Sequence, residues 1–95
     1  MITSEQIRAA RALLRWEQRN LADASKVSLP SIKRLETVPG PLAAQERTVA
    51  ALRTALEAAG VEFIAENGGG PGVRLRKAVG GETVAAEDLN ASNDE

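Results

Sequence analysis

Apolar residues recur at helical spacing through most of the first 60 residues of the chain. A run over about residues 5–15 places one apolar stripe along a helix, formed by Ile7, Ala10, Leu13 and Leu14. Ser4 precedes this run and is its predicted N-cap residue. A second long helix is predicted over residues 45–59, with Gly60 as its C-cap and with an apolar stripe at Val49, Leu52, Leu56 and Ala59.

Two shorter helices are predicted between these. Residues 17–25 form the first, whose apolar side consists of Leu21, Ala22 and Ala24. Residues 29–36 form the second, with Ile32 and Leu35 one turn apart. Ser28 is the expected N-cap of the second, and Pro30 lies in its first turn, where a missing N–H does no harm. The Pro- and Gly-containing segment 37–41 breaks the helical pattern.

After Gly60 the pattern changes to the alternation that is typical of strands. Residues 61–64 and 73–76 alternate and are joined by a Gly-rich loop, which predicts a β-hairpin with Glu62 facing Arg74 or Arg76. A single hairpin is marginally stable in water, so it must pack on a helix or pair with a partner's strand edge. The predicted homodimer interface consists of the hairpin's apolar residues, Val61, Phe63, Ile64, Val73 and Leu75.

Charge separates the last part of the chain from the rest. The 95 residues include 12 basic and 13 acidic residues, a net charge of -1. Residues 1–77 hold all 12 basic and eight of the acidic residues, so their net charge is +4. Residues 78–95 hold five acids and no Lys or Arg, which predicts a disordered acidic tail. Three regions are therefore expected: a helical domain over 1–60, a hairpin over 61–77 and the tail over 78–95.

Composition excludes most catalytic chemistry. Without Cys or His, the chain lacks the ligands of ordinary zinc and haem sites and the residues of a Ser-His-Asp triad. The Gly-rich loop lacks the spacing of a phosphate-binding loop. We therefore predict a protein that is not an enzyme and that binds no metal or cofactor. The N-terminus has no signal-peptide pattern and no apolar run is long enough to span a membrane, so a cytoplasmic protein with no membrane partner is expected.

The two short helices carry a more specific pattern, with Gln18, Leu21-Ala22, Val27-Ser28, Ile32 and Leu35-Glu36 at the spacing of a helix-turn-helix. Over about residues 5–60 this pattern resembles the lambda-repressor-like (Cro/XRE-type) family, in a small bacterial subgroup with a C-terminal β-hairpin. The resemblance implies a mainly α, four-helix DNA-binding domain that acts as a homodimeric transcriptional repressor, with helix 29–36 in the major groove of double-stranded DNA.

The resemblance also implies roles for individual residues. Gln18 would contact a phosphate, residues 28–34 would form the recognition face, and Glu36 would form a structural ion pair with Arg11. Arg19 is a candidate for a wider phosphate-binding surface. The full set of expected DNA-binding residues is Gln18, Arg19, Ser28, Leu29, Ser31, Lys33 and Arg34.

Several residues depart from the family pattern. Lys26 stands at a turn position that is commonly Gly, Arg15 stands where this subgroup commonly has Gly, and Glu17 replaces a capping Ser or Thr. Leu29 and Pro30 stand where polar or basic residues are usual. Leu29 could contact a thymine methyl group or a protein. The alternative function is therefore a protein-binding helix-turn-helix module, such as an antiactivator or an antitoxin.

Overall fold

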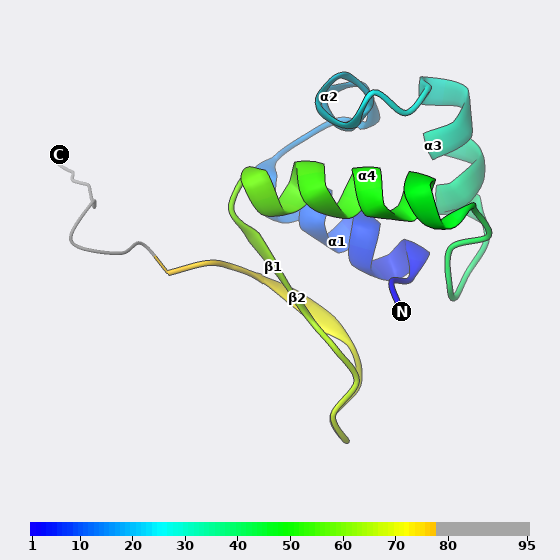
Figure 1. The fold of residues 1–95 in the computed structure, drawn as a ribbon. Coiled ribbons are helices and arrows are strands. Elements are labelled where there is room, and N and C mark those ends of the chain that lie inside the picture. The colour runs from blue at the N-terminus through cyan, green and yellow to red at the C-terminus, as the bar shows by residue number, and fades with distance from the viewer. Residues whose placement is uncertain (78–95) are drawn as a thin grey trace, which may run out of the picture.

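Four helices and a two-stranded antiparallel sheet make up the computed structural model, which describes residues 1–77 (Figure 1). The helices are α1 (Ser4–Leu14), α2 (Gln18–Ser25), α3 (Leu29–Thr37) and α4 (Glu46–Ala58), and the strands are β1 (Val61–Ile64) and β2 (Gly72–Leu75). The mainly helical fold with a hairpin is thus confirmed, and the predicted tail 78–95 lies outside the described residues. No helix within residues 1–77 has the length and apolarity needed to cross a membrane.

The start of α1 corrects one expectation from the sequence. Thr3, and not Ser4, is the N-cap: its Oγ1 accepts from the Gln6 N–H at 3.1 Å, and its own N–H donates to Gln6 Oε1 at 2.9 Å. This reciprocal arrangement needs a Gln or Glu three residues after the cap, and only Thr3 has one. Ser4 is buried, and its N–H donates to the Gly40 carbonyl at 2.9 Å, which ties α1 to the loop after α3.

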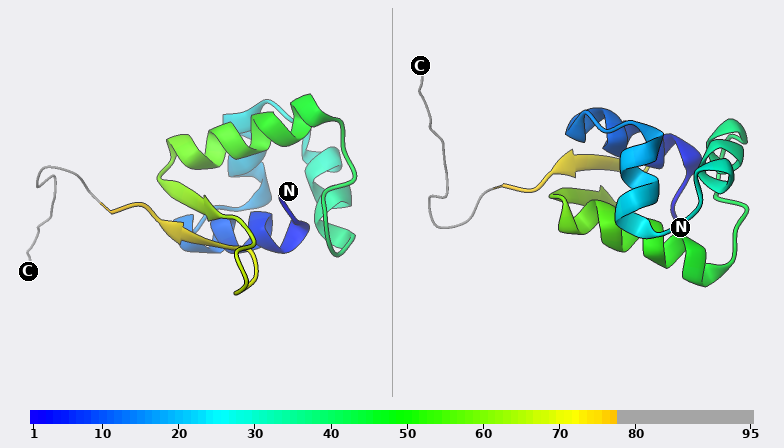
Figure 2. Two further views of the ribbon diagram at one scale, coloured as in Figure 1. Left: turned by 60° about the horizontal axis from the view of Figure 1, so that its bottom comes forward. Right: turned by 90° about the horizontal axis from the view of Figure 1, so that it is seen from above.

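The core lies between the helices and the hairpin. It consists of Ile2, Ile7, Ala10, Leu21, Ile32, Leu35, Leu52, Ala55, Leu56 and Val61. The hairpin covers the side of the molecule formed by α1 and α4, whereas α2 and α3 lie at the other end (Figure 2). The apolar stripes of all four helices therefore meet one another and one face of the sheet.

The hairpin packs on its own chain more closely than the sequence indicates. Glu62 pairs with Arg74 across the strands, with Glu62 Oε1 3.0 Å from Arg74 Nε. Gln6 is buried and its Nε2 donates to the carbonyls of Gly72 at 3.0 Å and Ile64 at 3.4 Å. The hairpin is thus held by hydrogen bonds to α1, which satisfies the need for packing within one protomer.

The predicted dimer interface is wrong for Val61 in particular. Val61 is fully buried in the core, so it cannot contact a second molecule. Phe63 and Val73 are half-buried against the same core, and the Arg53 guanidinium lies 5.7 Å from the centre of the Phe63 ring. Ile64 is also half-buried, and only Leu75 of the five predicted residues remains half exposed, at 50%. The hairpin's first strand therefore belongs to the monomer core.

Within residues 1–77, two non-glycine residues adopt the left-handed conformation, and they are the two residues that stand where the family pattern commonly has Gly. Arg15 (φ 58°) ends α1, and Lys26 (φ 66°) follows α2. The Cβ of an L-residue costs about 1 kcal/mol in this region relative to Gly. We expect Lys26→Gly and Arg15→Gly each to raise the free energy of unfolding in urea by up to about 1 kcal/mol. Lys26→Ala is the control, because it removes the charge and keeps the strain; equal stability of the Ala and Gly variants would contradict this.

Acid is expected to weaken the contact between α1 and the loop after α3. The pKa of Glu5 is lowered below its ordinary value of 4.5 because its carboxylate accepts from its own N–H and from the Gly40 N–H at 3.2 Å. A depressed pKa contributes stability above the unfolded-state value that is lost as pH falls through the folded value. The melting temperature of Glu5→Gln should therefore fall less than that of the wild type between pH 6 and pH 3. Parallel curves for the two proteins would refute this.

Candidate nucleic-acid interface

The helices α2 and α3 are joined by three residues that fix their relative orientation. The Lys26 N–H donates to the Ala22 carbonyl at 2.9 Å, and the Val27 N–H donates to Ser25 Oγ at 3.2 Å. Val27, the middle residue of the connection, is half-buried against the core. Ser28 caps α3 as expected, because its Oγ accepts from the Ser31 N–H at 3.3 Å. The connection is therefore an ordered turn that these three hydrogen bonds hold in place.

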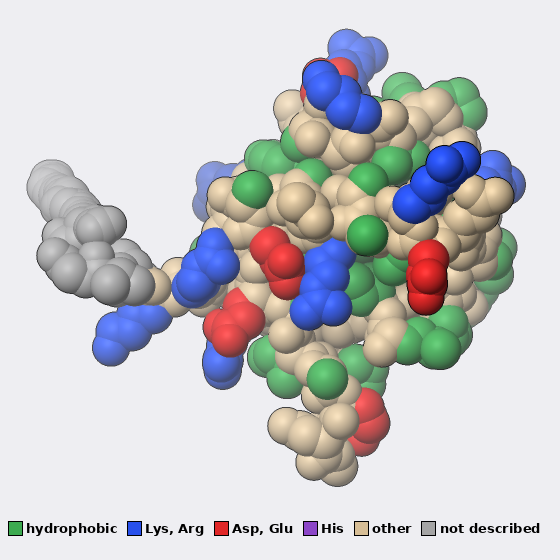
Figure 3. Space-filling model, viewed as in Figure 1, with side chains coloured by type: hydrophobic (Ala, Val, Ile, Leu, Met, Phe, Trp, Pro, Cys, Tyr) green, Lys and Arg blue, Asp and Glu red, His purple; other side chains and the backbone are tan. Residues whose placement is uncertain are grey.

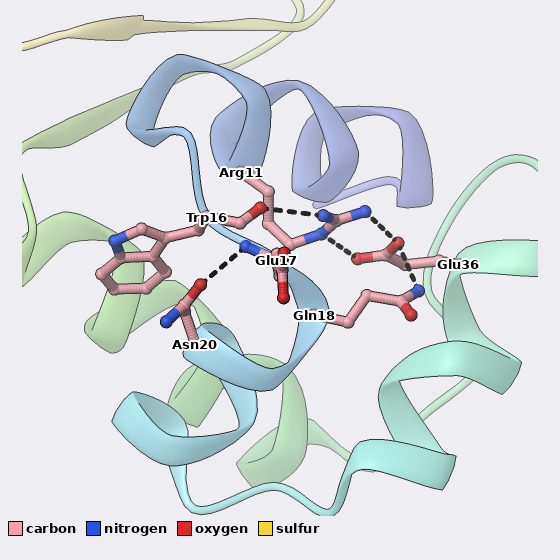
Figure 4. Close-up of polar contacts among 6 residues, drawn as sticks. All are labelled: Arg11, Trp16, Glu17, Gln18, Asn20 and Glu36. Atoms are coloured by element: carbon pink, nitrogen blue, oxygen red, sulfur yellow. Dashed lines mark hydrogen bonds and ion pairs between the residues drawn. The ribbon is translucent and has the colours of Figure 1, made fainter.

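Three helices meet at a buried carboxylate (Figure 4). Arg11 from α1 binds Glu36 from α3 with two parallel contacts, Nη2 to Oε1 at 2.7 Å and Nε to Oε2 at 2.8 Å. Arg11 Nη1 also donates to the Trp16 carbonyl at 3.0 Å, and Gln18 Nε2 donates to Glu36 Oε1 at 3.0 Å. The Glu36 side chain is only 4% exposed. This cluster therefore fixes the start of α2 and the end of α3 relative to α1.

Gln18 has a structural partner that the sequence does not reveal. One of its two side-chain N–H bonds is directed at Glu36, so the amide lies over the ion pair rather than free in solvent. The neighbouring Glu17 N–H donates to Asn20 Oδ1 at 2.8 Å. The side chain can still offer its second N–H outward, in an orientation that the ion pair determines. Gln18 thus connects the buried cluster to the surface at the start of α2.

Four exposed cations lie on α2, the turn and α3. Lys33 and Arg34 are exposed on α3, as are Arg19 on α2 and Lys26 in the turn. None of these four forms an ion pair with an acid within residues 1–77. Between Gln18 and Thr37 the only exposed acid is Asp23, since Glu36 is buried and paired. In Figure 3, Lys and Arg side chains project at the top, over α2, and at the right, where α3 and the start of α4 lie.

The remaining predicted residues of α3 lie at its first turn. Ser28 and Ser31 are within reach of solvent, and their hydroxyls bond to each other at 2.8 Å. Leu29 is half-buried, which differs from the expected outward position. It lines a shallow hollow of about 530 Å³ together with residues of α2 and the turn, and the neighbouring Pro30 is exposed.

A larger hollow adds residues that the sequence did not indicate. It measures about 740 Å³ and lies between the turn, α3 and the start of α4. Its polar lining consists of Lys26, Ser28, Ser31, Arg34, Gln45 and Thr48. Gln45 and Thr48 are 17 or more residues from the turn in sequence, so only the packing of α4 brings them there. The candidate interface therefore extends from α2 across α3 to the first turn of α4.

Comparison with known proteins identifies no relative from which a function could be inferred. No protein-family model matches the chain, and no curated protein matches it. The case for a function therefore depends on the α2–turn–α3 unit, its supporting ion pair and its exposed cations.

Proposed function

We propose that this protein is a sequence-specific DNA-binding transcriptional regulator that acts as a repressor and binds double-stranded DNA as a homodimer. In this proposal α2, the turn and α3 form a helix-turn-helix, and α3 enters the major groove. The observation that carries the proposal is the set of four exposed, unpaired cations on this unit, opposed by a single exposed acid within residues 18–37.

Each part of the unit has a role in the proposal. Lys33 and Arg34 supply a base contact and a phosphate contact from α3. Arg19 and Gln18 contact phosphates beside the groove, with Gln18 oriented by Glu36. The ion pair between Arg11 and Glu36 keeps α3 at a fixed angle to α1, so that these contacts need little reordering on binding.

A titration at two salt concentrations tests the proposal. The full chain is titrated by fluorescence anisotropy with the duplex upstream of its own gene, and with a scrambled duplex as the control. If four phosphates are neutralised, affinity should fall about 100-fold between 50 and 200 mM salt. Preference for the upstream duplex would support sequence specificity. Absence of binding at 50 mM salt by the folded protein would reject the proposal.

One observation favours protein binding as the second candidate function. Pro30 is exposed at the start of α3, and Val38 directly after its end is 47% exposed. Apolar groups at both ends of a short helix suit a protein surface as well as a groove. A chain that binds no duplex at low salt would favour this candidate, which includes the antiactivator and antitoxin roles.

A further inference from the structure

Both outer edges of the two-stranded hairpin carry backbone groups without a partner strand, and the edge formed by β2 is the one with a half-exposed apolar side chain, Leu75. Within residues 1–77 the sheet has only two strands, so the outer edge of β2 is unpaired. The Arg76 N–H donates to the Gly60 carbonyl at 2.7 Å, which marks this pair as a hydrogen-bonded one. Because such pairs alternate along an antiparallel ladder, Arg74 and Gly72 also bond toward β1. Val73 and Leu75 therefore direct their N–H and C=O groups outward.

Apolar side chains accompany this edge. Gln6 bonds to Gly72, and Ala9 lines a hollow together with Val73, so α1 and β2 run side by side in the same direction. Four helix residues cover about 6 Å and two strand residues about 6.6 Å, so the pair that follows Ala9 and Val73 is Leu13 and Leu75. Leu13 is 40% exposed and Leu75 is 50% exposed. The edge thus combines free hydrogen-bonding groups with apolar surface.

We propose that the β2 strands of two copies pair edge to edge in antiparallel fashion, with the two-fold axis at Arg74, to form a four-stranded sheet. Unpaired strand edges with apolar side chains are templates for another strand. The inference rests on the homodimer of the proposed function and supplies its interface. It does not depend on DNA binding.

Self-complementarity selects the register. Val73 of one copy lies opposite Leu75 of the other, which gives four hydrogen bonds and two apolar pairs. The register centred on Val73 places Pro71, which has no N–H, opposite Leu75. The register centred on Leu75 places Arg74 opposite Arg76 on both sides of the axis. In the proposed register the two Arg74 side chains face each other, and each is already paired with its own Glu62 at 3.0 Å.

Single-cysteine variants test this register directly, because the chain contains no cysteine. Arg74→Cys should form an intermolecular disulfide under mild oxidation, since residues opposite each other at a non-hydrogen-bonded position have Cα atoms about 4.5 Å apart. Arg76→Cys is the matched control, which removes the same charge from the same exposed face. Its two copies would lie four residues apart along the strands, about 14 Å, which is too far for a disulfide.

The expected result is a covalent dimer on a non-reducing gel for Arg74→Cys and none for Arg76→Cys. Equal cross-linking of the two variants, or none in either, would overturn the proposed pairing. Leu75→Pro provides an independent measurement, because it removes an outward N–H that the β1 ladder does not use. In sedimentation equilibrium its mass should fall from twice 10.0 kDa to 10.0 kDa, with an unchanged far-UV circular dichroism spectrum.

A wild-type chain that is monomeric at tens of micromolar would also overturn the inference. Its failure is distinguishable from failure of the proposed function. A monomer that still binds duplex DNA would reject the interface and leave the DNA-binding proposal standing. A cross-linked dimer without affinity for DNA would support the interface and reject the DNA-binding proposal.

Discussion

The double variant Lys33→Ala/Arg34→Ala is expected to bind the upstream duplex on the order of 100-fold more weakly than the wild type. Both side chains are exposed on α3 and form no ion pair within residues 1–77, so they are available to the groove. A base contact contributes about 1–3 kcal/mol, and loss of a phosphate contact also reduces the salt slope by about 1. Anisotropy titrations at several salt concentrations measure both quantities.

A control variant separates contact from net charge. Arg8→Ala/Arg53→Ala removes the same two positive charges from exposed positions on α1 and α4, outside the α2–turn–α3 unit. We expect its affinity to stay close to the wild-type value. If both double variants lose affinity equally, binding depends on overall charge alone, and α3 makes no specific contact with the DNA. Circular dichroism of each variant checks that the fold is retained.

The elements of the fold follow from local sequence signals, and their packing does not. Apolar spacing predicts all four helices and the hairpin to within one residue at each end. The N-cap is missed because Ser4 and Thr3 are both good caps, and the choice depends on Gln6 three residues after Thr3. The position of Val61 is missed because the contacts that bury it come from helices far away in sequence. The bond from Gln6 to Gly72 spans 66 residues, and no local pattern indicates it.

The candidate site also combines features that the sequence predicts with features that depend on packing. The family resemblance predicts the pair of Arg11 and Glu36, and the structure places Arg11 Nη2 2.7 Å from Glu36 Oε1. The bond from Gln18 to Glu36 was not expected, because a polar residue at a helix start gives no sign of which neighbour it meets. For Lys26 the sequence indicates only a strained turn position. Its place beside Arg34 in the larger hollow depends on how α4 packs against the turn.

The second large effect is expected at the buried ion pair. Arg11→Met should lower the free energy of unfolding by about 3–5 kcal/mol, because it leaves the Glu36 carboxylate buried without its cation. Gln18 alone would then bond to that carboxylate, and the Trp16 carbonyl would lose its donor. A loss of this size is a large fraction of the total stability of a small domain. Urea denaturation at pH 7 measures it.

The double variant Arg11→Met/Glu36→Leu gives this prediction its decisive control. Removing both partners leaves no unpaired buried charge, so this variant should be more stable than Arg11→Met alone. Arg53→Ala breaks an exposed pair with Glu57 and should cost at most about 1 kcal/mol. If Arg11→Met costs no more than Arg53→Ala, the buried pair does not hold the helices together. If the double variant folds but binds DNA more weakly, the pair positions α3 for binding as well as stabilising the fold.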